Sequence, residues 1–275
     1  MRKFKLVVTD LDGTLLSSCG KVSATDVNTL VKLGEKGVIR AIATGRSPYS
    51  FEKVMPKDFP IDYLIFSSGA GALNWKTKEI LYTTELLPAE VQLVADKLIA
   101  HEVDFMVHEP IPANHRFLYH ATGNVNPDFY RRIEIYNNFC QPFISGVPYD
   151  TCATQILAVL PGCVNRFEEV KMLFTEQKVI RATSPLDGES IWLEIFKKDV
   201  SKAYGIKWLC HAFNIGDDEV FTIGNDFNDL DMLQGFENSF VVANAPIELR
   251  QNFETVKSNN DSGFSDAVNR VDMLC

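Results

Sequence analysis

The sequence lacks a long apolar run, and this narrows the classes of protein to which it can belong. No stretch approaches the roughly 18 consecutive apolar residues of a membrane-spanning helix. The apolar run behind the basic start Met1-Arg2-Lys3-Phe4 is short and ends at two aspartates, whereas a secretory signal has a longer apolar segment without carboxylates. We therefore expect a cytoplasmic protein that has no membrane as a partner.

Basic residues are in the minority. Lysine and arginine number 27 against 36 aspartates and glutamates, which gives a formal net charge of -9. Proteins that bind nucleic acids or membrane surfaces need clustered basic side chains, so the charge balance argues against both kinds of partner. An anionic substrate is still compatible with it, because a metal, a lysine and backbone amides can make one site locally positive.

Paired cysteines and several cofactor motifs are also missing. The six cysteines are scattered without a C-x-x-C pair, which favours free thiols in a reduced protein over disulfides or a metal site. The sequence has no P-loop G-x-x-x-x-G-K-[ST], no dinucleotide-type G-x-G-x-x-G and no EF-hand spacing. It shows no internal repeat, and nothing in it indicates an oligomeric state. The 275 residues, 46% of them hydrophobic, suffice for two globular domains.

The first part of the chain alternates strands and helices. Short apolar runs at 5–9, 38–43 and 63–66 are typical of strands that are covered on both faces. Between them, Ser23 is a candidate helix cap, and Ser47-Pro48 is a typical helix start. Strands that alternate with helices over short links predict a parallel sheet with helical crossovers.

The middle of the chain departs from this pattern. A helix is expected from Pro88, followed by strand-like runs at 103–107 and 154–160 and by loops rich in Pro and Asn. The alternating pattern returns with a strand at 191–196. We therefore predict a core formed by residues 1–83 and 187–275, interrupted by a separate α/β insertion at 84–186.

The sharpest chemical signal is Asp10-Leu11-Asp12-Gly13-Thr14, directly after the first strand. In an open parallel sheet, ligands bind at the carboxyl ends of the strands. Two acids on one side of an extended segment suit a metal together with a nucleophile and an acid, and Gly13 permits a sharp turn. The alternative is a polar strand end before an ordinary turn.

Two further signals are weaker when each is taken alone. In Thr44-Gly45-Arg46, after the second strand, a hydroxyl and amides at a strand-to-helix turn can donate to phosphate oxygens. The alternative is a simple helix cap. Lys202 stands near a helix start, where the dipole disfavours a cation, so a role beside a carboxylate and a phosphate is plausible. The alternative is an exposed surface lysine.

The last signal is an acidic, amide-rich turn, Gly224-Asn225-Asp226-Phe227-Asn228-Asp229, which follows a strand at 219–223. Carboxylate and amide oxygens at such a turn are the hard ligands that Mg²⁺ requires. The alternative is a helix cap without a ligand.

Taken together, these four segments resemble the four motifs of the haloacid dehalogenase-like superfamily, and in particular its Cof-type phosphatases with a type IIB α/β cap. The segment Asn259–Phe264 resembles a late loop of the same family. The resemblance implies an α/β fold with a Rossmann-like parallel core, in which the insertion at 84–186 is a cap that selects the substrate.

The resemblance also implies roles for the residues. Asp10 would be the nucleophile, Asp12 the general acid and base, and Lys202 the group that neutralises charge between nucleophile and phosphate. The phosphate would be bound by Thr44, Gly45 and Arg46. The Mg²⁺ cofactor would be held by Asp10, Asp12, Asn225 and Asp229, with Asp226 as a further candidate ligand.

Two positions depart from the family pattern. The family usually has Asp where this chain has Asn225, and Asn can ligate a metal only through an uncharged oxygen. Asp226, next to it, could take over, or the site could bind the metal more weakly. Ser262 also stands where the family usually has Asp.

The implied function is Mg²⁺-dependent hydrolysis of small phosphate monoesters, such as sugar phosphates, through an aspartyl-phosphate. The partner would be a small phosphorylated metabolite. The alternatives are a phosphomutase on the same core, a dehalogenase, which Asp12 disfavours, and a regulatory or binding protein with little turnover. Asn225 is the one feature that favours this last alternative, and the intact Asp10, Asp12, Thr44 and Lys202 argue against it. Six polar and aromatic residues of the insertion are candidates for substrate contact, although packing or surface roles are commoner for such residues: Phe105, His108, His115, Arg116, Tyr119 and Arg131.

Overall fold

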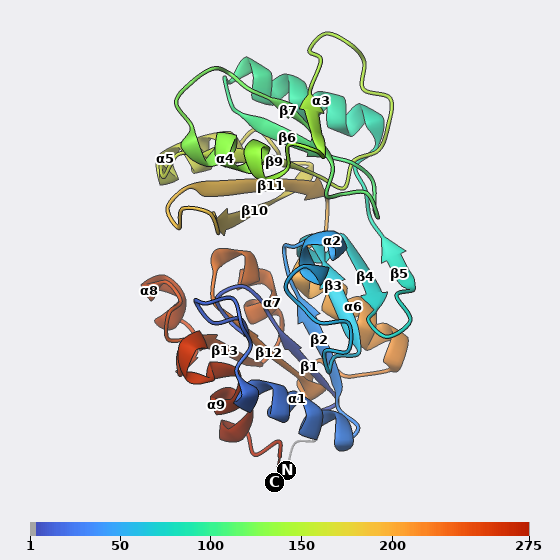
Figure 1. Cartoon of the computed structure of the whole chain (residues 1–275), viewed down its shortest axis with the longest axis vertical. Coiled ribbons are helices and arrows are strands. Elements are labelled where there is room, and N and C mark those ends of the chain that lie inside the picture. Colours follow the sequence, from blue (N-terminus) through green and yellow to red (C-terminus); the bar gives the residue numbers. More distant parts are fainter. Residues whose placement is uncertain (1–3, 275) are drawn as a thin grey trace. The chain divides into compact units, whose positions relative to one another are not determined.

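The chain folds into two compact units, as a computed structural model shows (Figure 1). The structure describes residues 4–274, so residues 1–3 and Cys275 of the predicted core lie outside the described part. One unit joins the residues up to Tyr82 with those from Ser201 onward, and the other is Thr83–Val200. Each unit has its own sheet, the first mainly parallel, so the predicted α/β fold with a parallel core is confirmed.

The strands of the first unit form an eight-stranded sheet, and they are β1 (Leu6–Thr9), β2 (Ile39–Ala43), β3 (Tyr63–Phe66), β4 (Gly71–Asn74), β5 (Ile80–Thr83), β12 (Val220–Gly224), β13 (Asn238–Val242) and β14 (Glu254–Val256). Their order is β14-β13-β12-β1-β2-β3-β4-β5. Pairing is parallel from β14 to β3, and β4 runs antiparallel to β3. Because β1 lies between β12 and β2, the carboxyl ends of these three strands meet at one edge of the sheet.

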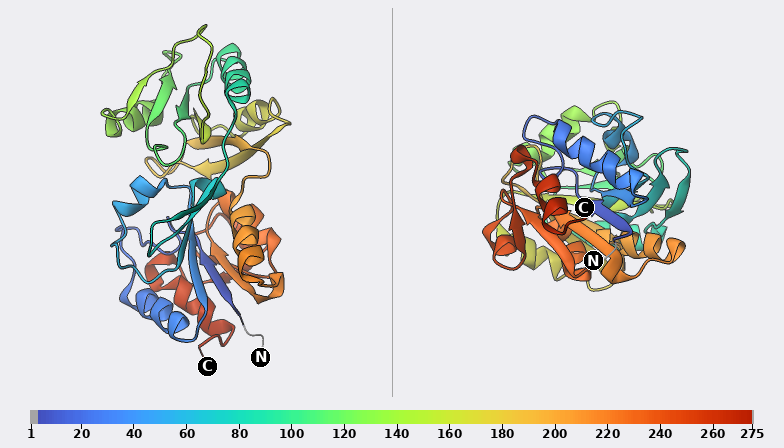
Figure 2. Two further views of the ribbon diagram at one scale, coloured as in Figure 1. Left: turned by 90° about the vertical axis from the view of Figure 1, so that its right-hand side faces the viewer. Right: turned by 90° about the horizontal axis from the view of Figure 1, so that it is seen from below.

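Helices cover both faces of this sheet (Figure 2), and they are α1 (Ala24–Glu35), α2 (Pro48–Glu52), α6 (Lys202–Phe213), α7 (Leu230–Gly235), α8 (Ile247–Arg250) and α9 (Gly263–Arg270). On one face, Ile206 of α6 and Met232 of α7 pack against buried side chains of β1 and β2. On the other, α1 contacts α9 through the hydroxyls of Thr29 and Ser265, 2.8 Å apart. As predicted, Ser23 caps α1, and its hydroxyl accepts from the Asp26 amide at 3.0 Å.

The second unit contains a six-stranded sheet made of β6 (Phe105–His108), β7 (Phe117–His120), β8 (Cys140–Pro142), β9 (Gln155–Leu160), β10 (Gln177–Thr183) and β11 (Ile191–Lys197). The order is β10-β11-β9-β6-β7-β8, antiparallel except between β7 and β8. Its helices are α3 (Pro88–Ala100), α4 (Pro127–Ile135) and α5 (Val164–Lys171). Within residues 4–274, no helix combines the length and the apolar character that crossing a membrane requires.

Side chains of the second unit alternate between two cores. Alternate residues of β6 pack with α3 and α5, and Phe105 is fully buried among them. Met106 faces the other way, toward Phe129 of α4. His108 is also buried, and its Nδ1 donates to the Asn114 carbonyl oxygen at 2.8 Å. Two of the six candidates for substrate contact, Phe105 and His108, are therefore packing residues of this unit.

The predicted return to the core at residue 187 is wrong. The strand predicted at 191–196 is β11, and it pairs antiparallel with β9 and β10 in the second sheet. The first unit resumes only at Ser201, just before α6. The reason is that a fully buried apolar run has the same pattern in a parallel and in an antiparallel sheet, so periodicity alone does not tell which sheet it joins. The other predicted boundary, between 83 and 84, lies one residue from the division after Tyr82.

Candidate functional site

The predicted site segments meet at the carboxyl ends of β1, β2 and β12. Asp10 follows β1 directly, and its amide donates to the Ile223 carbonyl oxygen of β12 at 2.9 Å. Thr44 follows β2, and Asn225 follows β12. Asp10 and Thr44 are buried, with 4% and 1% of their surfaces exposed. The topology therefore places these three segments, distant in sequence, side by side.

Lys202 is the first residue of α6 and is fully buried. Its Nζ lies 2.6 Å from Asp10 Oδ1 and 2.6 Å from Asp229 Oδ1. The helix dipole disfavours a cation at this position, and two carboxylates offset that cost. The reading of Lys202 as an exposed surface lysine is therefore wrong.

The three charges of this cluster do not balance. Burial raises the pKa of Asp10 to about 7, and Asp229 adds to the rise while Lys202 opposes it. Burial alone would lower the pKa of Lys202, but Asp10 and Asp229 outweigh it and hold that pKa above its usual value. Two carboxylates beside one ammonium leave an excess negative charge away from water, and a further cation would offset it.

Asp229 organises the turn after β12. Its Oδ2 accepts from the backbone amides of Asn225 at 2.7 Å and Asp226 at 3.1 Å, while its Oδ1 accepts from Lys202. A Cβ on Gly224 would lie 2.5 Å from this carboxylate, so the close approach requires glycine there. Because both oxygens of Asp229 are engaged, the geometry fits a residue that holds the turn and Lys202 better than a direct metal ligand. Asp226 joins this arrangement through its backbone amide.

The Asn225 side chain marks a place where oxygens converge. One end of its amide lies 3.0 Å from the Asp12 carbonyl oxygen, 3.1 Å from Asp10 Oδ2 and 2.9 Å from Thr14 Oγ1. With nitrogen at this end, the amide donates to all three atoms. With oxygen there, it accepts from the Thr14 hydroxyl and faces the two other oxygens.

These spacings fit a magnesium ion. Ligand oxygens on adjacent corners of an octahedron with Mg–O bonds near 2.1 Å are about 3 Å apart. The amide oxygen of Asn225 has this spacing from both Asp10 Oδ2 and the Asp12 carbonyl oxygen. Among the described residues, no group of three or more His, Cys, Asp or Glu side chains is arranged to hold a metal. At this place, two of the three oxygens come from an amide and a backbone carbonyl.

Asparagines from the far end of the chain hold the turn after Asp10. Gly13 has a φ of +79°, and a Cβ there would lie 2.5 Å from the Asn225 side chain. Asn244 Nδ2 donates to the Gly13 carbonyl oxygen at 2.8 Å, and Asn259 Nδ2 donates to that of Leu16 at 2.9 Å. The resemblance of the late loop pointed to this segment, but sequence reasoning gave Asn244 no role.

Arg46 pairs with Asp12 in the structure. Its Nε and Nη2 each lie 2.7 Å from one oxygen of the Asp12 carboxylate, a two-bond pairing between partly exposed side chains. Sequence reasoning assigned Arg46 to phosphate binding and missed this contact. The pairing fixes the direction of the Asp12 carboxylate, and the Asp12 backbone carbonyl faces Asn225.

Thr44 is held in place through both its backbone amide and its side-chain hydroxyl. Its amide donates to the Ile65 carbonyl oxygen of β3 at 2.9 Å, and its Oγ1 accepts from the Arg46 amide at 3.2 Å. A hydroxyl that accepts a hydrogen bond still carries a proton that it can donate. The amide of Ser68 donates to the Thr44 carbonyl oxygen at 3.0 Å, so the segment after β3 also belongs to this neighbourhood.

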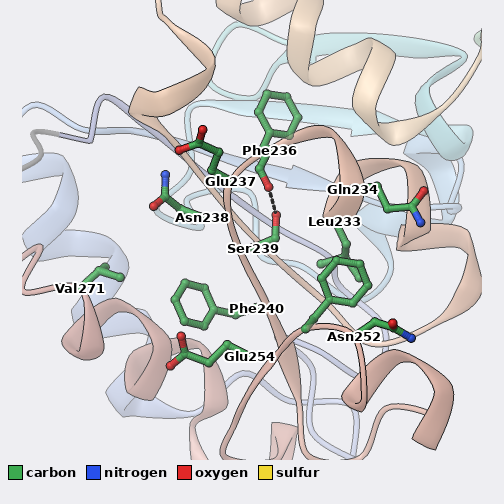
Figure 3. A pocket seen from close by; sticks show the side chains of 11 residues that line it. Leu233, Gln234, Phe236, Glu237, Asn238, Ser239, Phe240, Asn252, Glu254 and Val271 are labelled. Carbon is green, nitrogen blue, oxygen red and sulfur yellow. Dashed lines mark hydrogen bonds between the residues drawn. The ribbon is translucent and has the colours of Figure 1, made fainter.

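A separate hollow of about 510 Å³ lies beside β13 in the first unit (Figure 3). Leu233, Phe236, Phe240 and Phe253 contribute apolar side chains to it, and Ser239 Oγ donates to the Phe236 carbonyl oxygen at its wall. Among the described residues that line it, none is a predicted site residue. The chemistry described above is therefore not located in this hollow.

Known proteins resemble this chain in sequence and in fold. Residues 7–268 match the family of haloacid dehalogenase-like hydrolases. A presumed phosphatase of Haemophilus influenzae is 25% identical over 95% of this chain and 96% of its own length. The 5-amino-6-(5-phospho-D-ribitylamino)uracil phosphatase of Bacillus subtilis is 22% identical over 97% of this chain and 98% of its own. A solved HAD subclass IIB sugar phosphatase shares the fold, with a TM-score of 0.77 and 19% identity over 98% of this chain and 99% of that one.

Proposed function

The chain belongs to the haloacid dehalogenase-like hydrolases and is a phosphatase of that family, and we propose that it uses Mg²⁺ and an aspartyl-phosphate on Asp10 to hydrolyse small phosphate monoesters. One observation carries the proposal: the buried Asp10 carboxylate contacts Lys202 through one oxygen, and its other oxygen lies 3.1 Å from the Asn225 amide, which is also 3.0 Å from the Asp12 carbonyl oxygen. This arrangement suits a nucleophile whose charge is shared between an ammonium and a metal.

The first chemical step forms a bond from an Asp10 carboxylate oxygen to phosphorus and breaks the ester P–O bond. The departing alkoxide takes a proton from Asp12. Lys202 keeps its proton and remains beside Asp10, where its charge offsets that of the incoming phosphate. Asp229 holds the lysine in place from the other side, 2.6 Å from its Nζ.

The second step returns the enzyme to its starting state. A water molecule gives a proton to Asp12 and attacks phosphorus, the bond between Asp10 and phosphorus breaks, and inorganic phosphate leaves. Asp12 serves in both steps, so the direction of its carboxylate matters. The two bonds from Arg46 set that direction in the structure, and at least one of them has to open when Asp12 carries the proton that it donates.

The remaining groups bind the phosphoryl oxygens. The Thr44 hydroxyl and the Gly45 amide, at the turn after β2, are the donors that we propose for them. Asp10 Oδ2, the Asp12 carbonyl oxygen and the Asn225 amide oxygen would hold Mg²⁺. When bound, Mg²⁺ supplies positive charge against the phosphoryl oxygens and the Asp10 carboxylate.

We propose sugar phosphates and similar phosphorylated metabolites as the substrate class, with the insertion selecting among them. The support comes from two similar proteins, a sugar phosphatase and a phosphatase of a ribityl phosphate. Both act on phosphate esters of polyhydroxylated carbon chains.

We further propose that the protein works in the cytoplasm.

The experiment is a panel of metabolite phosphates assayed for released phosphate, with Mg²⁺ and with a chelator as control. We expect hydrolysis of at least one sugar phosphate, lost on chelation and abolished in Asp10→Asn. Isomerisation of a sugar phosphate that depends on a bisphosphate, without net phosphate release, would identify a mutase instead. A full panel without turnover, with Mg²⁺ binding intact, would favour a binding protein.

A second measurement tests the intermediate. Borohydride reduces an acyl phosphate to the alcohol, so trapping during turnover should convert Asp10 to homoserine, detected by mass spectrometry of the peptide. Asp10→Asn provides the blank. Turnover without any modified Asp10 peptide would contradict the nucleophile assignment.

A further inference from the structure

The segment after β3 has an unusual backbone. Ser67, Ser68 and Gly69 have φ angles of +48°, +53° and +100° in succession. Only glycine adopts positive φ without steric cost, so two serines in this region need support from their surroundings. The structure supplies it: the amides of Ser67 and Ser68 donate to the carbonyl oxygens of Arg46 at 2.9 Å and Thr44 at 3.0 Å.

Gly69 brings this segment against the start of α6. A Cβ on Gly69 would overlap the Ser201 carbonyl group, 2.5 Å from its carbon, and would lie 3.2 Å from the Lys202 amide nitrogen. The same Ser201 carbonyl oxygen accepts from the Gly205 amide at 3.2 Å, as the first hydrogen bond of the helix. The backbone that carries Lys202 therefore rests directly on Gly69.

Tyr82 fixes Gly69 from the other side. Its hydroxyl donates to the Gly69 carbonyl oxygen at 3.0 Å. The same hydroxyl lies 2.9 Å from where a Cβ on Gly205 would be, so it fits between Gly69 and the first turn of α6. Its ring packs against Tyr204 and Trp208 of that helix, with centroids 5.8 and 5.1 Å apart.

These contacts lie where the chain leaves and re-enters the first unit. Tyr82 is the last residue of that unit before the second, and Ser201 is the first after it. Lys202 therefore begins its helix directly after a long excursion of the chain, with one residue of the first unit before it. The strand β11 and the turn that precede α6 belong to the second unit, so within the first unit other segments have to hold the start of this helix.

We propose that Gly69 and Tyr82 are positioning residues for Lys202: together they fix the first turn of α6 so that the ammonium stays between Asp10 and Asp229. Neither residue touches the reacting atoms. The effect on catalysis rests on the proposed function, whereas the effect on the position of Lys202 does not.

Two variants test this, with a matched control. Tyr82→Phe removes only the hydroxyl, and Gly69→Ala adds a methyl group against Ser201. The control, Tyr63→Phe, removes a hydroxyl at the amino end of β3 in the same sheet. Each variant is labelled with a trace of acetic anhydride, and acetylation of Lys202 is measured by mass spectrometry relative to Lys207, which is exposed on the same helix.

We expect Tyr82→Phe to raise Lys202 labelling about 3- to 10-fold, the factor that one hydrogen bond is worth in a local equilibrium. Gly69→Ala should raise it further, and Tyr63→Phe should leave it unchanged. Labelling of Lys202 in Tyr82→Phe at the wild-type rate would overturn the proposal, even if Gly69→Ala fails to fold. An equal rise of Lys202 labelling in Tyr63→Phe would also overturn the proposal, since it would indicate that the whole unit is loosened and not the start of α6 alone.

Turnover gives a second, separable result. Tyr82→Phe should lower kcat about 3- to 10-fold at unchanged KM, and Gly69→Ala about 100-fold, because a misplaced catalytic group costs rate rather than binding. A normal kcat in Tyr82→Phe would overturn the positioning role. If the wild-type protein hydrolyses no phosphate ester, the proposed function fails, and the labelling result alone decides whether Tyr82 and Gly69 position Lys202.

Discussion

Replacement of Lys202 by methionine is the most direct test of the buried charge cluster. The side chain is fully buried, and its Nζ lies 2.6 Å from one oxygen of Asp10 and 2.6 Å from one of Asp229. Lys202→Met keeps most of the apolar volume but leaves two carboxylates, 5% and 0% exposed, without their cation. Breaking a buried ion pair by removing one partner costs about 3–5 kcal/mol. That is a large share of the roughly 5–15 kcal/mol that stabilises a domain.

The assay is urea unfolding in metal-free buffer, followed by tryptophan fluorescence, since Trp75 and Trp208 lie in the same unit as Lys202. Lys207→Met is the control, because this lysine is exposed on the same helix, and it should change the free energy of unfolding by less than about 0.5 kcal/mol.

A double variant separates charge from packing. In an Asp229→Asn background, Lys202→Met leaves one buried carboxylate instead of two, so it should cost distinctly less than in the wild-type background. The reasoning is refuted if Lys202→Met costs less than about 1 kcal/mol, or if its cost is the same in both backgrounds. Either result would mean that the two carboxylates do not depend on the lysine for their charge balance.

Three other outcomes follow from the structure. Asp12→Asn should slow turnover by about 10²–10⁴-fold, the usual contribution of general acid–base catalysis, and a rate near that of the wild type would exclude the role. Asn225→Asp should tighten Mg²⁺ binding in calorimetry and enlarge the rise in Tm on adding Mg²⁺, because it adds a charge beside Asp10; an unchanged affinity would mean that residue 225 is not a ligand. Burial lowers the pKa of His108 to about 3, so the neutral form contributes stability that is present above pH 6.5 and is lost as the pH falls toward 3. Between pH 6.5 and 5, the free energy of unfolding measured with urea should fall by about 2 kcal/mol in the wild-type protein, and this fall should be absent in His108→Leu. The same dependence of the free energy of unfolding on pH in both proteins would contradict this prediction.

The parts of the fold that could be predicted are those in which local pattern and structure agree. The apolar run before Asp10 is short and bounded by polar residues, as expected of the buried strand that it forms, and Ser23 caps its helix through a bond that spans three residues. The strand at 191–196 was predicted as a strand and placed in the wrong sheet. Its burial pattern is the same in either environment, and only the pairing with β9 and β10 distinguishes them.

The candidate site likewise combines contacts that could be predicted from the sequence with contacts that could not. Asp10, Thr44 and Asn225 follow neighbouring strands, so the topology of a parallel sheet is enough to bring them together. The pairing of Arg46 with Asp12 and the contact of Gly69 with Ser201 depend on side-chain directions and on packing between distant segments. No spacing in the sequence encodes either contact, and sequence reasoning missed both.

The amide of Asn225 differs from a carboxylate in one respect that bears on metal exchange. Half a turn about a single side-chain bond swaps its oxygen for an N–H group, and in that orientation it donates to Asp10, Asp12 and Thr14. A carboxylate in its place would repel Asp10 whenever the cation departs. If Mg²⁺ binds as proposed, the amide could therefore exchange an oxygen that faces the ion for an N–H group that faces Asp10 without a movement of the backbone.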